Sequence, residues 1–237
     1  FEINDSNIFY RNIENDVLFI NKINNLKYYF DPKDQKNTLL TNSKIFNFPY
    51  HLEVKDYKKE KKIISKIDFE FLDLKVINDL NYKVDHKDGF IKFIYNKDLT
   101  EGTYKIKENS FEFDLLDKSL NSNFKYKGTI NLIPFFSEVF GNIKSINLYE
   151  ILNSEAIFVQ LFKMKLLYNK NLNINKIKKA EKILPYNDLI DLVLNLKIEE
   201  GLVDINNTNF NWSNNVDFKI SDSLLYVKDN NLVLDGN

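Results

Sequence analysis

The chain has 237 residues, of which 43% are apolar and 14% aromatic, and this composition excludes an intrinsically disordered polypeptide. Its 33 basic and 34 acidic residues give a net charge of −1, which argues against a nucleic-acid partner because such proteins concentrate basic residues on one surface. The absence of cysteine excludes disulfides, thiol catalysis and zinc–thiolate sites, and no run approaches the ~20 apolar residues that a membrane-spanning helix needs.

The first part of the chain predicts strands with one helix signal among them. Extended segments are predicted at 6–12, 17–22, 25–30 and 48–57. Asp31-Pro32 resembles a helix N-cap followed by proline at the first helical position, so we expect a short helix at about 32–40. The basic run 58–62 lies between two alternating segments and favours a solvated hairpin turn, the alternative being a contact for an anionic partner.

Alternation of apolar and polar residues with a period of two continues through the middle of the chain. Within 61–71, Ile63, Ile67 and Phe69 share one parity while lysines and acids occupy the other. Further strands are predicted at 73–84, 89–96, 102–107, 111–115 and 124–132. Asp88-Gly89 and Glu101-Gly102 predict turns, and connections this short favour antiparallel hairpins.

One segment, at about 148–168, breaks this period. Its apolar residues group on one helical side and Asn153 and Ser154 offer caps, so it predicts a helix. That helix either caps the end of a sheet or faces lipid or a partner. The segment 172–184 fits a helix or a strand equally.

The last part of the chain returns to strands, including 202–212, 223–228 and 231–235. The longest unbroken apolar row of the sequence is Ile190, Leu192, Leu194, Leu196 and Ile198. Val216, Phe218 and Ile220 form a shorter row. Trp212 with its neighbouring aromatics indicates either a stacking platform or ordinary core packing.

No residue constellation indicates catalysis, a metal or a cofactor, and we expect a non-enzymatic protein. The two histidines, His51 and His86, are 35 positions apart. His86 with Asp85 and Asp88 could form a metal site, although turns commonly collect such residues. A hydrolase would need either histidine beside a nucleophile or a carboxylate, and neither nucleophile-elbow nor phosphate-loop motifs occur.

The predicted fold class is mostly β. We expect one elongated domain over 1–237, with a possible sub-boundary near 147–170, in which a long antiparallel meander forms a curved, groove-like or partly open sheet with one or two short helices. So little helix cannot cover the apolar face of so many strands, so the sheet either closes as a sandwich or barrel or leaves an apolar groove for acyl chains. The candidate lining residues are Phe124, Tyr126, Ile130, Ile190, Leu192, Leu194, Leu196, Ile198, Val216, Phe218 and Ile220, and core packing is the alternative for each.

The order of several C-terminal motifs resembles the AsmA-like family. The segment 196–205, Leu-Lys-Ile-Glu-Glu-Gly-Leu-Val-Asp-Ile, is followed by Asn206–Phe210, and then by Leu-Leu-Tyr-Val at 224–227 and Leu-Val-Leu-Asp-Gly at 232–236. The strands of 7–30 and the apolar helical segment followed by renewed strands are also similar to that family.

The resemblance implies a body in the periplasm of a Gram-negative bacterium and an anchor in the inner membrane. Members form long β grooves that carry phospholipids toward the outer membrane, which implies acyl chains as ligands and a role in outer-membrane lipid homeostasis. No catalytic residues come with the family. Because the chain starts at Phe1, we expect it to be a fragment of a longer protein whose anchoring segment lies elsewhere. The alternative function is a closed β-sandwich or barrel that binds a protein partner or a carbohydrate.

Overall fold

The fold was analysed in a computed structural model that describes residues 1–11, 15, 17–45, 48–83, 86–95, 97–117, 125–149, 157–163, 165–213, 215–229 and 231–236. The chain divides into two compact units, Phe1–Glu108 and Asn109–Asn237. Strands make up 75% of the structure, so the predicted mostly-β fold class is confirmed. The predicted sub-boundary at 147–170 lies inside the second unit.

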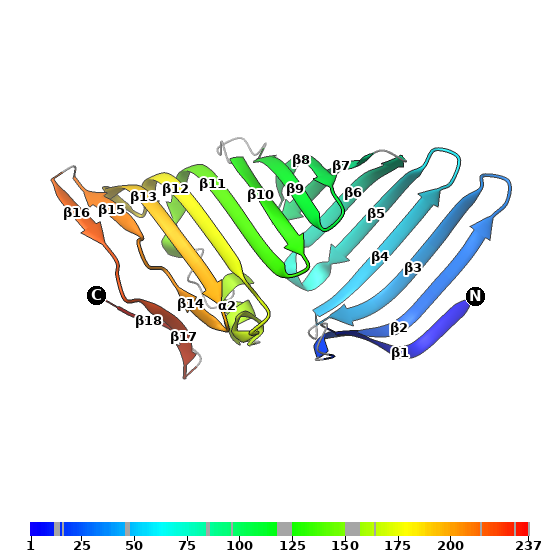
Figure 1. Cartoon of the computed structure of the whole chain (residues 1–237), viewed down its shortest axis with the longest axis horizontal. Coiled ribbons are helices and arrows are strands. Elements are labelled where there is room, and N and C mark those ends of the chain that lie inside the picture. Colours follow the sequence, from blue (N-terminus) through cyan, green and yellow to red (C-terminus); the bar gives the residue numbers. More distant parts are fainter. Residues whose placement is uncertain are drawn as a thin grey trace. The chain divides into compact units, whose positions relative to one another are not determined.

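The first unit is an antiparallel sheet in which every strand pairs with the next one along the chain (Figure 1). Its strands are β1 (Glu2–Arg11), β2 (Val17–Asp31), β3 (Lys36–Ile45), β4 (Phe48–Tyr57), β5 (Lys62–Phe69), β6 (Leu74–Lys83), β7 (His86–Tyr95) and β8 (Asp98–Ile106). The only helical element among its described residues is the one-turn 3-10 helix η1 (Glu70–Leu72). In the strand order of the whole sheet, which continues from β8 into the second unit, β1 is an end strand with β2 as its single neighbour, so the sheet does not close on itself.

The predicted helix at 32–40 is wrong, because residues 32–35 form a turn and Lys36 already begins β3. The carboxylate Oδ1 of Asp31 accepts hydrogen bonds from the backbone amides of Lys33 at 3.0 Å and Asp34 at 3.4 Å. Aspartate makes the same local hydrogen bonds to backbone amides in turns and at helix N-termini, so an Asp-Pro pair does not distinguish a turn from the start of a helix. The basic run forms the β4–β5 hairpin turn, as predicted.

Asp88-Gly89 and Glu101-Gly102 were predicted as turns, but both lie inside strands, β7 and β8. Gly89 is paired directly with Tyr104 across these strands, and a Cβ on Gly89 would overlap the tyrosine ring. The glycine therefore serves close packing of an aromatic side chain within the sheet.

The second unit is a mixed sheet. Its strands are β9 (Ser110–Asp117), β10 (Lys125–Leu132), β11 (Phe135–Asn147), β12 (Ile174–Leu184), β13 (Tyr186–Glu199), β14 (Leu202–Asp204), β15 (Asn209–Trp212) and β16 (Val216–Lys219), with β17 (Leu224–Lys228) and β18 (Asn231–Asp235) forming a separate hairpin. All pairs are antiparallel except β11 with β12, which run parallel. The ambiguous segment 172–184 is thus mainly a strand.

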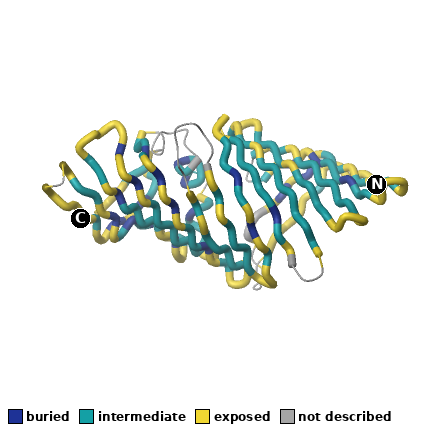
Figure 2. The backbone as a smooth tube through the Cα atoms, turned by 90° about the horizontal axis from the view of Figure 1, so that it is seen from above, coloured by how far each residue is buried: buried dark blue, intermediate teal, exposed yellow. Residues whose placement is uncertain are grey.

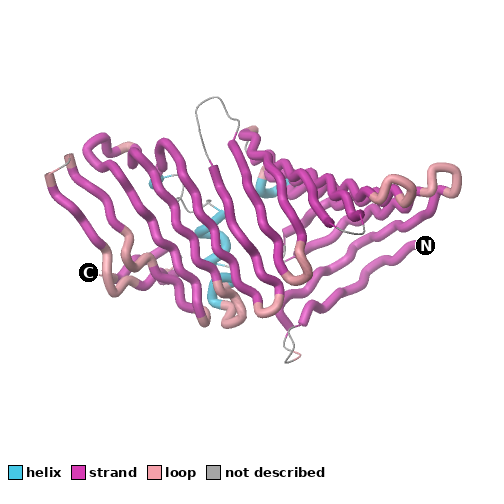
Figure 3. The backbone as a smooth tube through the Cα atoms, turned by 45° about the horizontal axis from the view of Figure 1, so that its top comes forward, coloured by secondary structure: helices cyan, strands magenta, loops and turns pink. Residues whose placement is uncertain are grey.

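A helical connection joins the two parallel strands, as parallel pairing requires a long crossover. It contains α2 (Ile157–Lys163) and the 3-10 helix η2 (Leu166–Tyr168), and Figure 3 shows these helical segments beside the strands of the unit. The helix predicted at 148–168 is therefore confirmed where it coincides with α2. Residues 150–156 and 164 lie outside the described residues.

Both hydrophobic clusters of buried residues lie in the second unit. The first joins α2 and η2 to β13, β14 and β17 and consists of Phe162, Leu167, Ile198, Val203, Ile205 and Leu225. The second lies over β11, β12 and β13 and consists of Ile143, Ile146, Ala180, Ile183 and Leu192. In the first unit most strand residues are intermediate in exposure, which Figure 2 shows as long teal segments with few buried positions.

Candidate functional site

The first unit presents an apolar sheet face on β4–β7, here called the open face. Directly paired residues of neighbouring strands point to the same side of a sheet. One such row joins Leu52, Ile67, Val76 and Phe93 through successive pairs. With the rows on either side, the open face comprises Tyr50, Leu52, Val54, Ile63, Ile67, Phe69, Leu74, Val76, Leu80, Ile91 and Phe93, all of them half-buried.

No helix or second sheet lies over the open face within the part of the first unit that the structure describes. The side chains are half-buried because they flank one another along the sheet. The apolar rows are broken at Ser65 and Asn78, which hydrogen-bond to each other. Large exposed apolar surfaces are a general feature of interaction sites, so this face is a candidate for one.

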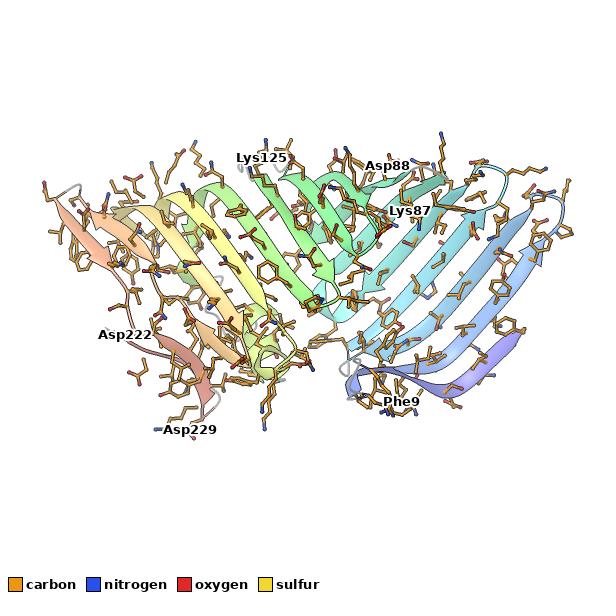
Figure 4. The ribbon with its side chains drawn as sticks, in the orientation of Figure 1. Phe9, Lys87, Asp88, Lys125, Asp222 and Asp229 are labelled. Atoms are coloured by element: carbon orange, nitrogen blue, oxygen red, sulfur yellow. The ribbon has the colours of Figure 1, made fainter. Side chains whose placement is uncertain are left out.

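The opposite face of the same strands carries charge. Ion pairs on it join Lys55 to Glu53 at 2.6 Å, Lys62 to Asp79 at 2.8 Å, Lys75 to Asp68 at 3.0 Å and Lys92 to Glu101 at 3.5 Å. The Lys55 ammonium, by its hydrogen bond, lowers the pKa of Glu53 below its ordinary value. Figure 4 shows side chains standing on both sides of the strands. This face also carries Ile64, Ile77, Phe90 and Ile94, but its ion pairs make it the more charged of the two faces.

The few polar groups on the open side of the sheet are hydrogen-bonded to one another. The Tyr82 hydroxyl donates to Asp56 Oδ1 at 2.7 Å, and the Tyr104 hydroxyl donates to Asn78 Oδ1. Tyr104 is only 4% exposed, and burial raises the pKa of its hydroxyl. These pairs lower the cost of placing polar atoms beside apolar ones.

The lining residues predicted on β13 lie mainly within the packed part of the second unit. Leu192 and Ile198 are buried members of the two hydrophobic clusters, and Leu194 and Leu196 pack against the first cluster beneath α2. The predicted row is interrupted at Asp191, which has a positive φ of 54° beside the register irregularities of β13. Ile190 therefore belongs to the segment beyond this irregularity.

The remaining predicted lining residues fall on different strands. Tyr126 and Ile130 are half-buried on β10, and Ile220 packs against the first cluster. Val216 is 50% and Phe218 is 38% exposed on β16. Phe124 lies outside the described residues.

Exposed aromatics gather on the β15–β16 hairpin. Phe218 stacks on Phe210, with ring centroids 5.1 Å apart, and lies 6.3 Å from Trp212. Trp212 is 52% exposed. The hairpin thus combines one stacked aromatic pair with an accessible tryptophan.

His51 is the histidine whose side chain the structure describes, and it lies in no catalytic arrangement with the other described residues. His51 is exposed on β4, and its Nδ1 is 2.9 Å from Asn42 Oδ1. Asp85 and the side chain of His86 are not among the described atoms, so a metal site at that turn stays a prediction. No group of three or more potential ligands for a metal ion occurs within the described part of the chain.

Two lysines of β12 lie on the side of the second sheet that carries its clusters. Lys176 is paired with Val139 and Leu196, and Lys178 with Gly141 and Leu194. Each Nζ lies 5.9 Å from the centroid of the Tyr126 ring. Burial lowers the pKa of Lys176, and burial together with the Lys176 charge lowers the pKa of Lys178 to about 8.

Tyr126 reaches these lysines because it is paired with a glycine. A Cβ on Gly141 would lie 2.5 Å from the tyrosine Cε1. The ring therefore lies over the glycine backbone, toward β12. Sequence patterning pointed to Tyr126 but not to the lysines, whose parity on β12 became visible only with the strand register.

No protein-family model, curated protein or solved structure matches this chain. The AsmA-like resemblance therefore stays a prediction. None of the described helices is long and apolar enough to cross a membrane.

Proposed function

We propose that this protein binds the acyl chains of lipids on the open face of its first unit and serves lipid transport without catalysis. One observation carries the proposal: an apolar face built by four strands has no covering layer within the described part of the first unit, while its reverse carries several ion pairs. A lipid chain supplies the missing apolar layer and needs no fixed hydrogen-bond partners.

The dimensions and energies of the face fit such a ligand. Four neighbouring strands span about 14 Å across, and a ten-residue strand extends over roughly 33 Å. Each methylene removed from water contributes about 0.8 kcal/mol. Contact over several methylenes thus gives useful affinity, while the absence of directional contacts allows a chain to slide along the sheet.

The cellular setting follows from the AsmA-like resemblance and is part of the proposal. The protein would act in the periplasm, be held at the inner membrane by a segment outside this chain, and assist phospholipid movement toward the outer membrane. The open face supports this role, because its apolar rows continue from one strand to the next and could guide an acyl chain across the sheet.

A pair of variants on β5 tests the proposal. Ile67 lies on the open face and Ile64, three residues away, lies on the charged face, and both are half-buried. Ile67→Gln removes apolar contact worth about 1.5 kcal/mol, so we expect roughly tenfold weaker binding of a fluorescent fatty-acyl probe. Ile64→Gln is the matched control and should bind within twofold of the unchanged protein.

Native mass spectrometry of the gently extracted protein complements the titration. We expect co-purified phospholipid that is reduced in Ile67→Gln and retained in Ile64→Gln. Absence of lipid across several detergents, or equal loss in both variants, would contradict acyl-chain binding at the open face.

A second candidate function rests on the exposed Trp212 beside Phe218 on the β15–β16 hairpin. Aromatic faces of this kind stack on sugars and at protein interfaces. Carbohydrate or partner binding that is lost in Trp212→Ala, with probe binding unchanged, would favour this function over the lipid one.

A further inference from the structure

The open face of the first unit differs in chemistry between its two ends. Alternate residues of a strand share one side, so the row of β4 on this face consists of Phe48, Tyr50, Leu52, Val54 and Asp56. Its side chains thus change from aromatic to aliphatic to charged along a single strand. A ligand that matches this row is apolar over most of its length and polar at one end.

The aromatic end of the row lies beside acidic side chains. The ring of Phe48 is 5.9 Å from that of Phe71, which is 72% exposed. Phe71 belongs to η1, with Glu70 before it and Asp73 after it in the connection from β5 to β6, and both acids are exposed. Negative charge here disfavours an anion, so this end suits the apolar part of a ligand.

The polar end of the row holds a cation in place. Asp56 Oδ1 accepts a hydrogen bond from the Tyr82 hydroxyl at 2.7 Å, and its Oδ2 accepts from Asn37 Nδ2 at 3.5 Å and from the Lys58 ammonium. The hydrogen bond to Asp56 raises the pKa of Lys58, so this side chain is charged at neutral pH. Because an ammonium has three N–H donors and the Lys58 side chain is 52% exposed, it can also donate to an oxygen of a ligand.

The basic run at the β4–β5 turn adds further positive charge to this end. It contains four lysines and one glutamate, and Lys59 and Lys61 are exposed. The backbone of the turn is held by its neighbours, since Lys58 N donates to Gln35 O at 3.2 Å and Tyr82 N donates to Lys61 O at 2.9 Å. Figure 1 shows the β2–β3 and β4–β5 turns at the same edge of the sheet. The lysines are therefore anchored where the apolar row ends.

We propose that the β4–β5 turn binds the anionic head group of an acyl lipid whose chain lies on the open face, with Lys58, Lys59 and Lys61 as the cationic contacts. The chain then runs from Val54 toward Phe48. A free anion would meet only exposed lysines, whereas a lipid gains the apolar contact as well. This inference rests on the proposed function, which it deepens by giving the charge and the direction of the bound lipid.

The first test compares short-chain phosphatidylglycerol with diacylglycerol of the same chains in titrations of the whole chain. We expect the anionic lipid to bind about fivefold more tightly at low salt, and this preference should shrink as salt screens the exposed charges. Lys59→Gln/Lys61→Gln leaves the Asp56–Lys58 ion pair in place. It should reduce the preference to less than about twofold without changing diacylglycerol binding.

Lys44→Gln/Lys97→Gln is the charge-matched control. Both lysines are exposed, and they lie in the β3–β4 and β7–β8 connections at the opposite ends of the strands. This control, and the charge-retaining Lys59→Arg/Lys61→Arg, should keep the preference for the anionic lipid. A preference unchanged in Lys59→Gln/Lys61→Gln, or absent from the unchanged protein, would overturn the head-group site while leaving acyl-chain binding intact.

The second test reads the direction of the lipid from two photoreactive phosphatidylglycerols, one labelled near the head group and one at the end of the chain. The first should modify Val54 and Leu80, and the second Tyr50 and Phe69. The same adducts from both lipids, or the reverse distribution, would overturn the proposed direction.

Two further outcomes are distinguishable. Glycerol phosphate binding as tightly as phosphatidylglycerol would show a site for a free anion and overturn the lipid assignment. Failure of both lipids to bind would overturn the proposed function and this inference together.

Discussion

The packing of α2 against the second unit gives the most quantitative test of the fold. Phe162 has no exposed surface and makes edge-on ring contacts with Phe158 at 5.1 Å and Tyr168 at 5.8 Å. Replacing a buried phenylalanine by alanine costs about 3–5 kcal/mol, and aromatic pairs add about 0.5–1.5 kcal/mol each beyond area. We expect Phe162→Ala to lower the free energy of unfolding by about 4 kcal/mol.

Urea unfolding followed by tryptophan fluorescence measures this loss where it occurs, because the only tryptophan, Trp212, lies in the second unit. If the free energy of unfolding falls by about 2 kcal/mol per molar urea, the urea midpoint of Phe162→Ala should be about 2 M lower than that of the unchanged protein. Phe136→Ala on β11 is the control, since Phe136 is 39% exposed, and should cost less than about 1 kcal/mol. Equal small losses in the two variants would refute the packing of α2 on this sheet.

Three further predictions concern single positions. The pKa of Lys178 is lowered to about 8 from 10.5, so the unfolded state binds this proton more tightly than the folded state does. The charged side chain therefore destabilises the fold fully below pH 8, and this destabilisation fades as the pH rises toward 10.5. In urea titrations, Lys178→Met should therefore be more stable than the unchanged protein by about 3 kcal/mol at pH 7 and by about 1.5 kcal/mol at pH 9.5. A stability difference between the two proteins that does not change with pH would argue against a buried charge. Gly89→Ala should destabilise the first unit by about 1–3 kcal/mol in thermal melts followed by circular dichroism, because its Cβ would overlap the Tyr104 ring, and an unchanged melt would contradict that packing. Asp31→Ala should cost about 1 kcal/mol in the same assay through loss of the two turn hydrogen bonds, whereas an unaffected melting temperature would show that the turn does not need them.

Alternation in the sequence predicted most strands because the period of two is a local property. Ile63, Ile67 and Phe69 do share one face of β5, and the basic run does form a hairpin turn. Signals that depend on tertiary partners were misread. Gly89 indicated a turn by its backbone freedom, but its small size serves the Tyr104 ring across the sheet.

The predicted lining illustrates the same limit. The row on β13 was predicted as lining because it is long and apolar, but such a row is also typical of a packed surface. In this chain its residues pack into the two hydrophobic clusters, the first of which includes Phe162 of α2. In the sequence, the open face appears only as alternation of apolar and polar residues in the segments of β4–β7. Its lack of a covering layer follows from the structure, in which the described part of the first unit contains no helix beyond the single turn of η1. The parallel pairing of β11 with β12 was also inaccessible, since pattern alone does not give strand direction.

The central claim is that lipid chains lie on one particular side of the first sheet. The most direct measurement is photo-crosslinking with a fatty acid that carries a photoreactive group in its chain, followed by mass-spectrometric mapping of the modified residues. The proposed function predicts adducts on Leu52, Ile67, Val76 and Phe93, with few on Ile64 or Ile77 of the opposite face. Adducts spread equally over both faces, or confined to the second unit, would contradict it.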